Sequence, residues 1–179
     1  MRRALVIAIG IVALGALSGG AAYERARPQQ QLLQNVEWRE VAWPFPRDGW
    51  PAGKAFRSGE VEIYVRPKIG FCNCDVGVAD DDEVDRVADL DLISARFVPL
   101  EAGRVVRVAE MQGRIRAYEL NMSDGSRHTA VGIAVLHRCD LMVAVAKGRG
   151  DVAGVQSAAL AFLATGKMRS WMAAAMEGR

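Results

Sequence analysis

The sequence predicts an α+β domain: a mainly antiparallel sheet with a short acidic-capped helix and a C-terminal helix packed on it. Two observations lead to this prediction. Short segments of alternating apolar and polar residues are separated by tight turns, and two later segments repeat their apolar residues at helical spacing. Tight turns join strands that run in opposite directions, so the sheet is expected to be antiparallel. An apolar signal or anchor helix is expected to precede the domain.

The first strand is expected over Val36 to Trp43, where valine and tryptophan alternate with charged residues. The alternation slips at Glu40, which predicts a β-bulge. Glu60 to Arg66 is the clearest strand, because its apolar residues occupy every second position. Pro67 is expected to end this strand or to lie at a sheet edge, since proline donates no hydrogen bond to a neighbouring strand.

Two turns organise the middle of the chain. Arg104 to Glu110 and Arg114 to Leu120 are expected to form a hairpin around Gln112 and Gly113. The turn at residues 123–126 leads into a strand that begins near Thr129 and ends near Leu136. One strand of the first hairpin places three polar side chains on the face opposite its apolar ones, and these are Arg114, Arg116 and Tyr118. Such a stripe suits anion binding, but more often it is the solvated face of a sheet.

Leu141 to Ala146 is continuously apolar, which is typical of a central strand covered on both faces. A short helix is expected from the aspartates at 80–82 through about Leu92, because carboxylates cap the free N–H groups of a helix start. Asp151 is expected to cap a C-terminal helix. Its apolar stripe changes phase after Gly166, which predicts a kink or a second short helix.

The N-terminal 22 residues have the layout of a secretory signal peptide. Arg2 and Arg3 precede the uncharged apolar run Ala4 to Leu17, and small residues follow it up to Ala22. Positive charge stays on the cytoplasmic side, so the rest of the chain is expected to be translocated. Cleavage would release it into the periplasm, whereas an uncleaved segment of nearly 20 residues would anchor it in the inner membrane. The sequence leaves both outcomes open.

We therefore expect a signal peptide or anchor at 1–22, a polar spacer at 23–35, and a single exported domain at 36–179. Arg2 and Arg3 are the only charged residues before Glu24, so the remainder has 21 basic and 21 acidic residues and no net charge. A neutral chain lacks the basic surface that nucleic acid requires, which argues against nucleic acid as a partner.

Three cysteines lie in the part expected to be exported: Cys72, Cys74 and Cys139. An oxidising compartment favours a disulfide between Cys139 and either Cys72 or Cys74, with one thiol left over. A second interpretation adds His137 to the three cysteines as a copper or zinc site, because soft sulfur and imidazole ligands suit these ions. A third is thiol exchange, although the usual Cys-x-x-Cys motif is absent. No other cofactor is indicated.

The segment from Asp75 to Asp91 carries eight acidic residues against one basic residue, Arg86. It does not match a calcium-binding EF-hand loop, because Arg86 and Leu92 stand where glycine and a bidentate glutamate are needed. An irregular calcium site stays open. The simpler interpretation is a well-capped helix start in which Asp82 pairs with Arg86 four residues later.

A proline-rich loop after the first strand brings Trp43, Phe45 and Trp50 into one short segment. These aromatic residues predict either a lid on the core or a surface that binds a protein partner. No nucleophile motif is recognisable around the serines or the two histidines, so the sequence favours a function without catalysis. We expect an envelope protein that contacts the membrane through its N-terminal segment and acts as a binding or assembly module. The alternative is a periplasmic metal-binding or thiol-redox protein.

Overall fold

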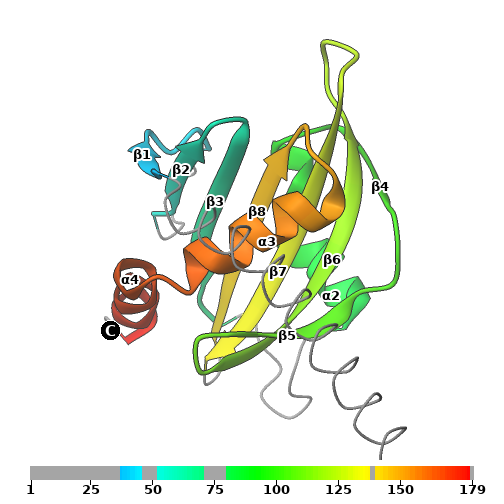
Figure 1. Cartoon of the computed structure of the whole chain (residues 1–179). Coiled ribbons are helices and arrows are strands. Elements are labelled where there is room, and N and C mark those ends of the chain that lie inside the picture. The colour runs from blue at the N-terminus through cyan, green and yellow to red at the C-terminus, as the bar shows by residue number, and fades with distance from the viewer. Residues whose placement is uncertain (1–36, 46–51, 71–79, 138–139, 178–179) are drawn as a thin grey trace, which may run out of the picture. The chain divides into compact units, whose positions relative to one another are not determined.

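Eight β-strands form one antiparallel sheet, in which β4 and β5 both pair with β6, at opposite ends of that strand (Figure 1). The strand order is β1-β2-β3-β8-β7-β6-β4, and β5 pairs with β6. The computed structural model describes residues 37–45, 52–70, 80–137 and 140–177. The strands are β1 (Arg39–Val41), β2 (Lys54–Ser58), β3 (Val61–Lys68), β4 (Arg96–Pro99), β5 (Arg104–Val108), β6 (Met111–Asn121), β7 (Arg127–His137) and β8 (Asp140–Gly148).

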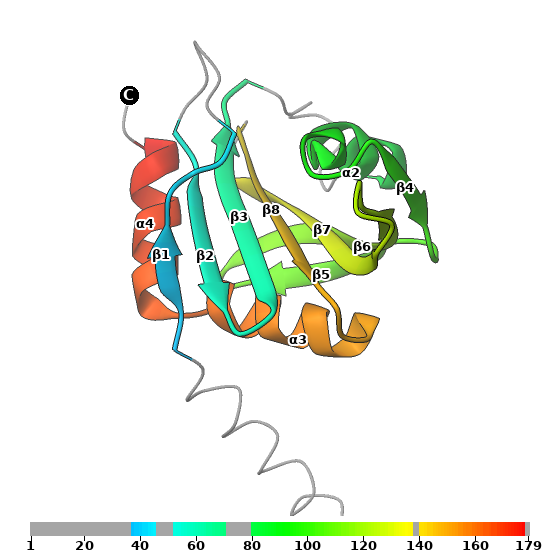
Figure 2. The same cartoon turned by 90° about the horizontal axis from the view of Figure 1, so that it is seen from above.

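The sheet lies between two layers of helix (Figure 2). Helices α3 (Val152–Leu163) and α4 (Gly166–Glu177) cover one face, and α2 (Asp81–Val87) with the 3₁₀ helix η1 (Leu90–Leu92) covers part of the other. The predicted antiparallel α+β domain is confirmed. The expected signal or anchor helix lies outside the described residues, and within those residues no helix is long and apolar enough to cross a membrane.

The larger core lies between the sheet and the two C-terminal helices. Strand residues such as Ile63, Ile133 and Met142 point to this side because side chains alternate along a strand. The helices contribute two sets of buried side chains. These are Val155, Ala159, Phe162 and Leu163 from α3, and Met168, Met172 and Met176 from α4. Asp151 caps α3 by accepting a 2.6 Å hydrogen bond from the Gly154 N–H, and a second helix begins at Gly166, as predicted.

The opposite face is buried by the short α2–η1 segment. Val84 and Val87 of α2 pack on the apolar residues of β7 and β8, while Leu90 of η1 lies in a cluster with Tyr118. Strand β8 runs between β3 and β7 with nearly all of its residues buried. The continuous apolar run at 141–146 is therefore a central strand, which confirms the prediction.

Several boundaries differ from the sequence prediction. Strand β1 is only three residues long and pairs regularly with β2 through Glu40, so no bulge is present there. Strand β3 continues through Pro67 and pairs with β8 along its length. The proline is tolerated inside the sheet because β2 pairs with β3 only as far as Val65, which leaves Pro67 with a single neighbouring strand among the described residues.

The hairpin of β5 and β6 turns at Ala109 and Glu110, three residues earlier than predicted, since Val108 and Met111 are direct partners. Ala109 itself adopts the left-handed conformation, with φ of 53°. Gly113 lies within β6 instead, where a β-carbon would come 2.2 Å from the Ala134 carbonyl oxygen. This glycine allows close approach of two strands rather than a turn.

Helix α2 ends earlier than predicted. Asp89 takes up a left-handed conformation, with φ of 49°, and separates α2 from η1. The predicted cap is confirmed, because Asp80 accepts a 2.7 Å hydrogen bond from the Glu83 N–H. The ion pair on the exposed side is Arg86 with Glu83, at 3.4 Å, rather than Arg86 with Asp82.

Candidate functional site

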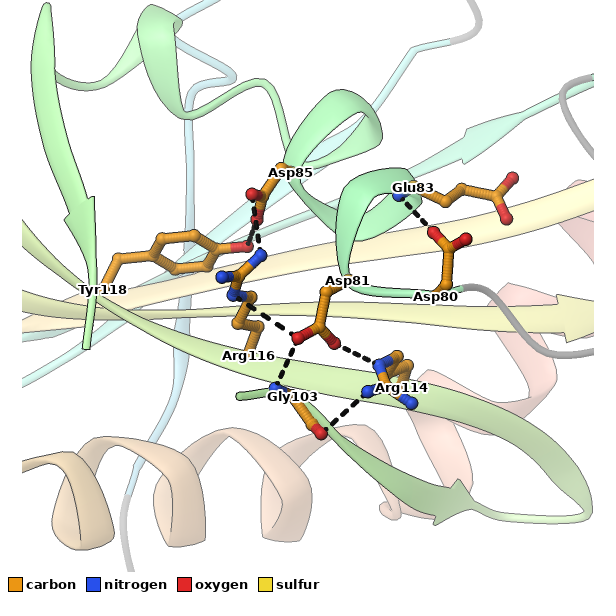
Figure 3. Close-up of polar contacts among 8 residues, drawn as sticks. All are labelled: Asp80, Asp81, Glu83, Asp85, Gly103, Arg114, Arg116 and Tyr118. Carbon is orange, nitrogen blue, oxygen red and sulfur yellow. Dashed lines mark hydrogen bonds and ion pairs between the residues drawn. The ribbon is translucent and has the colours of Figure 1, made fainter. Parts of the chain in front are cut away.

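The inner side of α2 and the facing strand β6 form a network of charged groups (Figure 3). Asp81 accepts hydrogen bonds from the Gly103 N–H at 3.0 Å and from Arg114 Nε. Asp85 accepts one from Arg116 at 2.8 Å and one from the Tyr118 hydroxyl at 2.6 Å. Asp81 and Asp85 of α2 are therefore each matched by donors on β6.

This network explains the polar stripe on β6. Arg114 and Arg116 point at α2 and pair with its carboxylates, so the stripe faces a helix. The Gly103 N–H and Arg114 hold the pKa of Asp81 below its usual value. Burial, together with the hydrogen bond to Asp85, raises the pKa of Tyr118 well above its usual value. The lowered pKa keeps Asp81 ionised and the raised pKa keeps Tyr118 protonated. In these states Asp81 accepts and Tyr118 donates the hydrogen bonds that join β6 to α2.

A second charged cluster joins β3 to the end of α2. Asp89 accepts a hydrogen bond from Arg66 and a second, of 2.8 Å, from Lys68 Nζ. Arg66 and Lys68 are only 6% and 5% exposed. Burying such charges is costly unless they are paired, so the left-handed turn at Asp89 serves to bring a carboxylate to them.

The aromatic residues of the predicted partner surface pack on the same face. Trp43, Phe45 and Tyr64 make edge-to-face contacts, with ring centroids 5.1 to 6.3 Å apart. The indole N–H of Trp43 donates a 2.8 Å hydrogen bond to the Phe45 carbonyl oxygen, and the ring lies against Gly53. Trp43 and Phe45 are half-buried. These contacts hold the segment in one conformation, in which Trp43 and Phe45 keep part of their surface exposed.

These rings line one side of a cavity of about 20 Å³, room for roughly one water molecule. Asp89 and Ile93 also line it. Beside it, Glu62 accepts hydrogen bonds from Lys147 at 2.8 Å, from the Tyr64 hydroxyl at 2.5 Å and from Arg57. Burial opposes ionisation of Glu62, but these donors outweigh it and lower its pKa to about 2.

The other predicted site residues are only partly visible. Cys72, Cys74, Cys139 and Trp50 lie outside the described residues. His137 is the last residue of β7, and its Nε2 is buried 3.8 Å from Glu177 Oε1 without a hydrogen-bond partner in the described part of the chain. Within that part, no three His, Cys, Asp or Glu side chains are grouped to hold a metal ion.

The segments that flank the cysteines do come together. Lys68 and Leu141 are direct partners in β3 and β8, and the Gly70 N–H donates a 2.8 Å hydrogen bond to Asp140 Oδ1. Cys72 and Cys139 are each within two residues of this contact in the sequence.

The role of the acidic residues was not anticipated, although the sequence contains a signal for it. Asp81, Asp85 and Asp89 recur every four residues, which places side chains on one side of a helix. Arg114 and Arg116 alternate along a strand, which likewise places them on one face. What the sequence does not show is that these two faces meet.

Comparison with known protein families gives no match, and comparison with curated proteins also gives none. Among solved structures, the chain is similar to one from Pseudomonas aeruginosa that is described as "Protein of Unknown Function PA94" and "Putative Regulator". The two are 10% identical, the match covers 73% of this chain and 82% of the other, and the TM-score is 0.43. A similarity of this degree identifies neither a shared fold nor a shared function.

Proposed function

We propose that the chain is an exported or membrane-anchored envelope protein whose domain is a non-enzymatic binding or assembly module. Export is inferred from the layout of residues 1–22, with basic residues ahead of an apolar run. Binding is inferred from the segment Trp43 to Phe45, which holds two half-buried aromatic residues in a fixed conformation. Preorganised aromatic side chains make good anchors because little conformational entropy is lost when a partner binds.

The binding proposal is tested by affinity purification from solubilised membranes. Wild type is compared with a Trp43→Ala/Trp50→Ala variant, and Trp171→Ala on α4 serves as a matched control. We expect a partner that wild type and the control retain and the double variant loses. Thermal unfolding of each protein shows whether the variant is folded, and Phe45→Ala provides a second variant of the same surface. Equal recovery with all variants would contradict a partner surface at this segment.

The location is tested by fractionating cells and determining the N-terminus of the recovered protein. A protein that begins near Ala22 or Tyr23 in the periplasmic fraction indicates cleavage. An intact N-terminus in the membrane fraction indicates an anchor. Recovery of the intact chain in the cytoplasm would contradict export.

We also propose a disulfide between Cys139 and either Cys72 or Cys74. The contact between Gly70 and Asp140 supports it, because Cα atoms are about 3.8 Å apart along a chain and both cysteine segments begin next to this contact. Such a bond would close a loop of about 65 residues and contribute roughly 4 kcal/mol if unstrained. Thiol counting under denaturing conditions should find one free thiol per chain. Three free thiols in protein taken from the periplasm would contradict the bond.

The alternative function is metal binding or thiol redox chemistry with Cys72, Cys74, His137 and Cys139. It is supported by the buried His137 Nε2, which has no hydrogen-bond partner among the described residues. Imidazole nitrogen and thiolate sulfur suit copper(I) or zinc. Elemental analysis of protein purified from the periplasm separates the two functions. One copper or zinc ion per chain, lost in His137→Ala, favours the alternative, whereas no metal together with a Cys139 disulfide contradicts it.

A further inference from the structure

We propose that the sheet edge formed by β4 and β5 binds an extended acidic segment of a partner protein as an additional strand. This inference rests on the proposed binding function and adds the chemistry of the partner that the domain would bind.

Strands β4 and β5 act together as one edge. Strand β4 pairs with β6 from Tyr118 to Asn121, and β5 pairs with it from Met111 to Ile115. Leu100 continues the pairing between them, because its N–H donates a 3.0 Å hydrogen bond to the Ala117 carbonyl oxygen. No described strand pairs with the outer side of either one. An edge of this kind offers backbone N–H and C=O groups to an extended peptide.

Exposed apolar side chains gather at this edge. Val98, Leu100 and Val105 are 55%, 50% and 55% exposed, and they are the exposed large hydrophobic residues of the described chain. The register places Val98 on the side of the sheet that faces α3, opposite Glu119, and Val105 on the side that faces α2, opposite Arg114. An added strand would therefore find apolar neighbours for side chains on both of its faces.

The charge of the edge indicates what binds there. Arg96, Arg104 and Arg107 are exposed and make no ion pair with any residue that the structure describes. Glu101 is the single acidic residue between Arg96 and Val108. Opposite charges across paired strands are favourable, so a strand that alternates apolar and acidic residues complements this edge.

The same charges argue against two other occupants. A second copy of the chain, paired edge to edge, would bring the arginines of one copy against those of the other. The second occupant is the spacer at 23–35, which carries Glu24, Arg25 and Arg27 and so has a net positive charge. Like charges would disfavour its pairing with this edge. Arginines and proline at an edge strand such as β4 can also prevent edge-to-edge aggregation. Prevention of aggregation does not explain why three large apolar side chains are exposed at the same edge.

The test uses the purified full chain in a mild detergent and a fluorescent, end-capped peptide of about nine alternating valine and glutamate residues. Binding is followed by fluorescence anisotropy. A valine–lysine peptide of equal length and a valine–glutamate peptide with alternate backbone amides methylated serve as peptide controls. We expect saturable binding of the acidic peptide, at least about tenfold weaker binding of the lysine peptide, and loss of binding on methylation, since an added strand needs both opposite charge and backbone donors.

Charge reversal locates the site. Arg104→Glu/Arg107→Glu should weaken binding at least about tenfold, whereas Lys167→Glu/Arg169→Glu, an equal reversal at exposed positions of α4, should leave it unchanged. Val105→Glu supplies a second edge variant, with the same expected loss of binding, if the double reversal does not fold. Equal binding of the acidic and lysine peptides, no binding, or equal effects of the two reversals would overturn the proposal. A dimer that dissociates when the edge is reversed would assign the edge to a second copy. The assay requires no envelope partner, so its failure leaves the proposed function standing.

Discussion

Tyr118 of β6 donates a 2.6 Å hydrogen bond to Asp85 of α2, and the same carboxylate binds Arg116. Tyr118 and Asp85 are 33 positions apart in the sequence. A helix of seven residues is too short to be stable by itself, so its place on the sheet depends on contacts such as this one. The charged residues of this face hold the fold together, which leaves the aromatic segment and the β4–β5 edge as the candidate binding surfaces.

The first prediction concerns this contact. Asp85→Asn and Tyr118→Phe should each lower the free energy of unfolding by about 1–3 kcal/mol. The first removes the charged partner of Arg116, and the second removes the hydroxyl group that donates a hydrogen bond to the Asp85 carboxylate. Urea unfolding followed by circular dichroism measures the effect. Asp82→Asn, on the exposed side of α2, is the matched control and should change little. In the double variant the losses should be smaller than additive, and additive losses would contradict a direct interaction.

The second prediction concerns acid stability. The pKa of Glu62 is about 2 in the folded protein, against an ordinary value of 4.5. A carboxyl group whose pKa is lowered by folding contributes stability that is complete above the unfolded pKa and is lost as the pH falls toward the folded pKa. Stability should therefore decline between about pH 4.5 and 2. Glu62→Gln should reduce this decline in unfolding curves measured at several pH values, and an unchanged slope would contradict the assignment.

The third prediction concerns the close approach of β6 and β7. Gly113→Ala should destabilise the protein by more than about 2 kcal/mol, because the new methyl group would meet the Ala134 carbonyl oxygen. Gly150→Ala is the control, since a β-carbon there meets nothing within 4 Å and its backbone is not left-handed. Similar unfolding midpoints for the two variants would show that the strands are further apart than the structure has them.

The fourth prediction concerns α4. Met172 is completely buried under the sheet, so Met172→Ala should cost about 2–5 kcal/mol through lost contacts and the cavity left behind. Lys167→Ala on the exposed side of the same helix should have little effect. A small change for Met172→Ala in denaturant unfolding would mean that α4 is not packed on the sheet.

Much of this fold can be predicted from local pattern. Several features are visible in the sequence because each depends on neighbouring residues. They are the alternation in β3, the apolar run in β8, the caps at Asp80 and Asp151, and the break just before Gly166. Strands β2 and β4 were missed. Strand β2 has its apolar residues Ala55 and Phe56 side by side, and β4 is only four residues long, so neither shows a clear period.

The candidate sites were harder to predict because they depend on tertiary contacts. The acidic residues of α2 were interpreted as the cap of a helix start, whereas Asp81 and Asp85 turn toward the arginines of β6. The exposed apolar residues at Val98, Leu100 and Val105 look like ordinary strand residues in the sequence. Their exposure follows from the sheet ending at β4 and β5, which local pattern does not reveal.

The most direct test of the central proposal, an exported module that binds a protein partner, is photo-crosslinking in intact cells followed by fractionation. A photoreactive residue replaces the exposed Pro44, which lies between Trp43 and Phe45, and in a control it replaces the exposed Ser157 of α3. We predict one discrete protein adduct from position 44, in the periplasmic or membrane fraction, and none from position 157. Equal adducts from both positions, no adduct, or adducts confined to the cytoplasm would contradict the proposal.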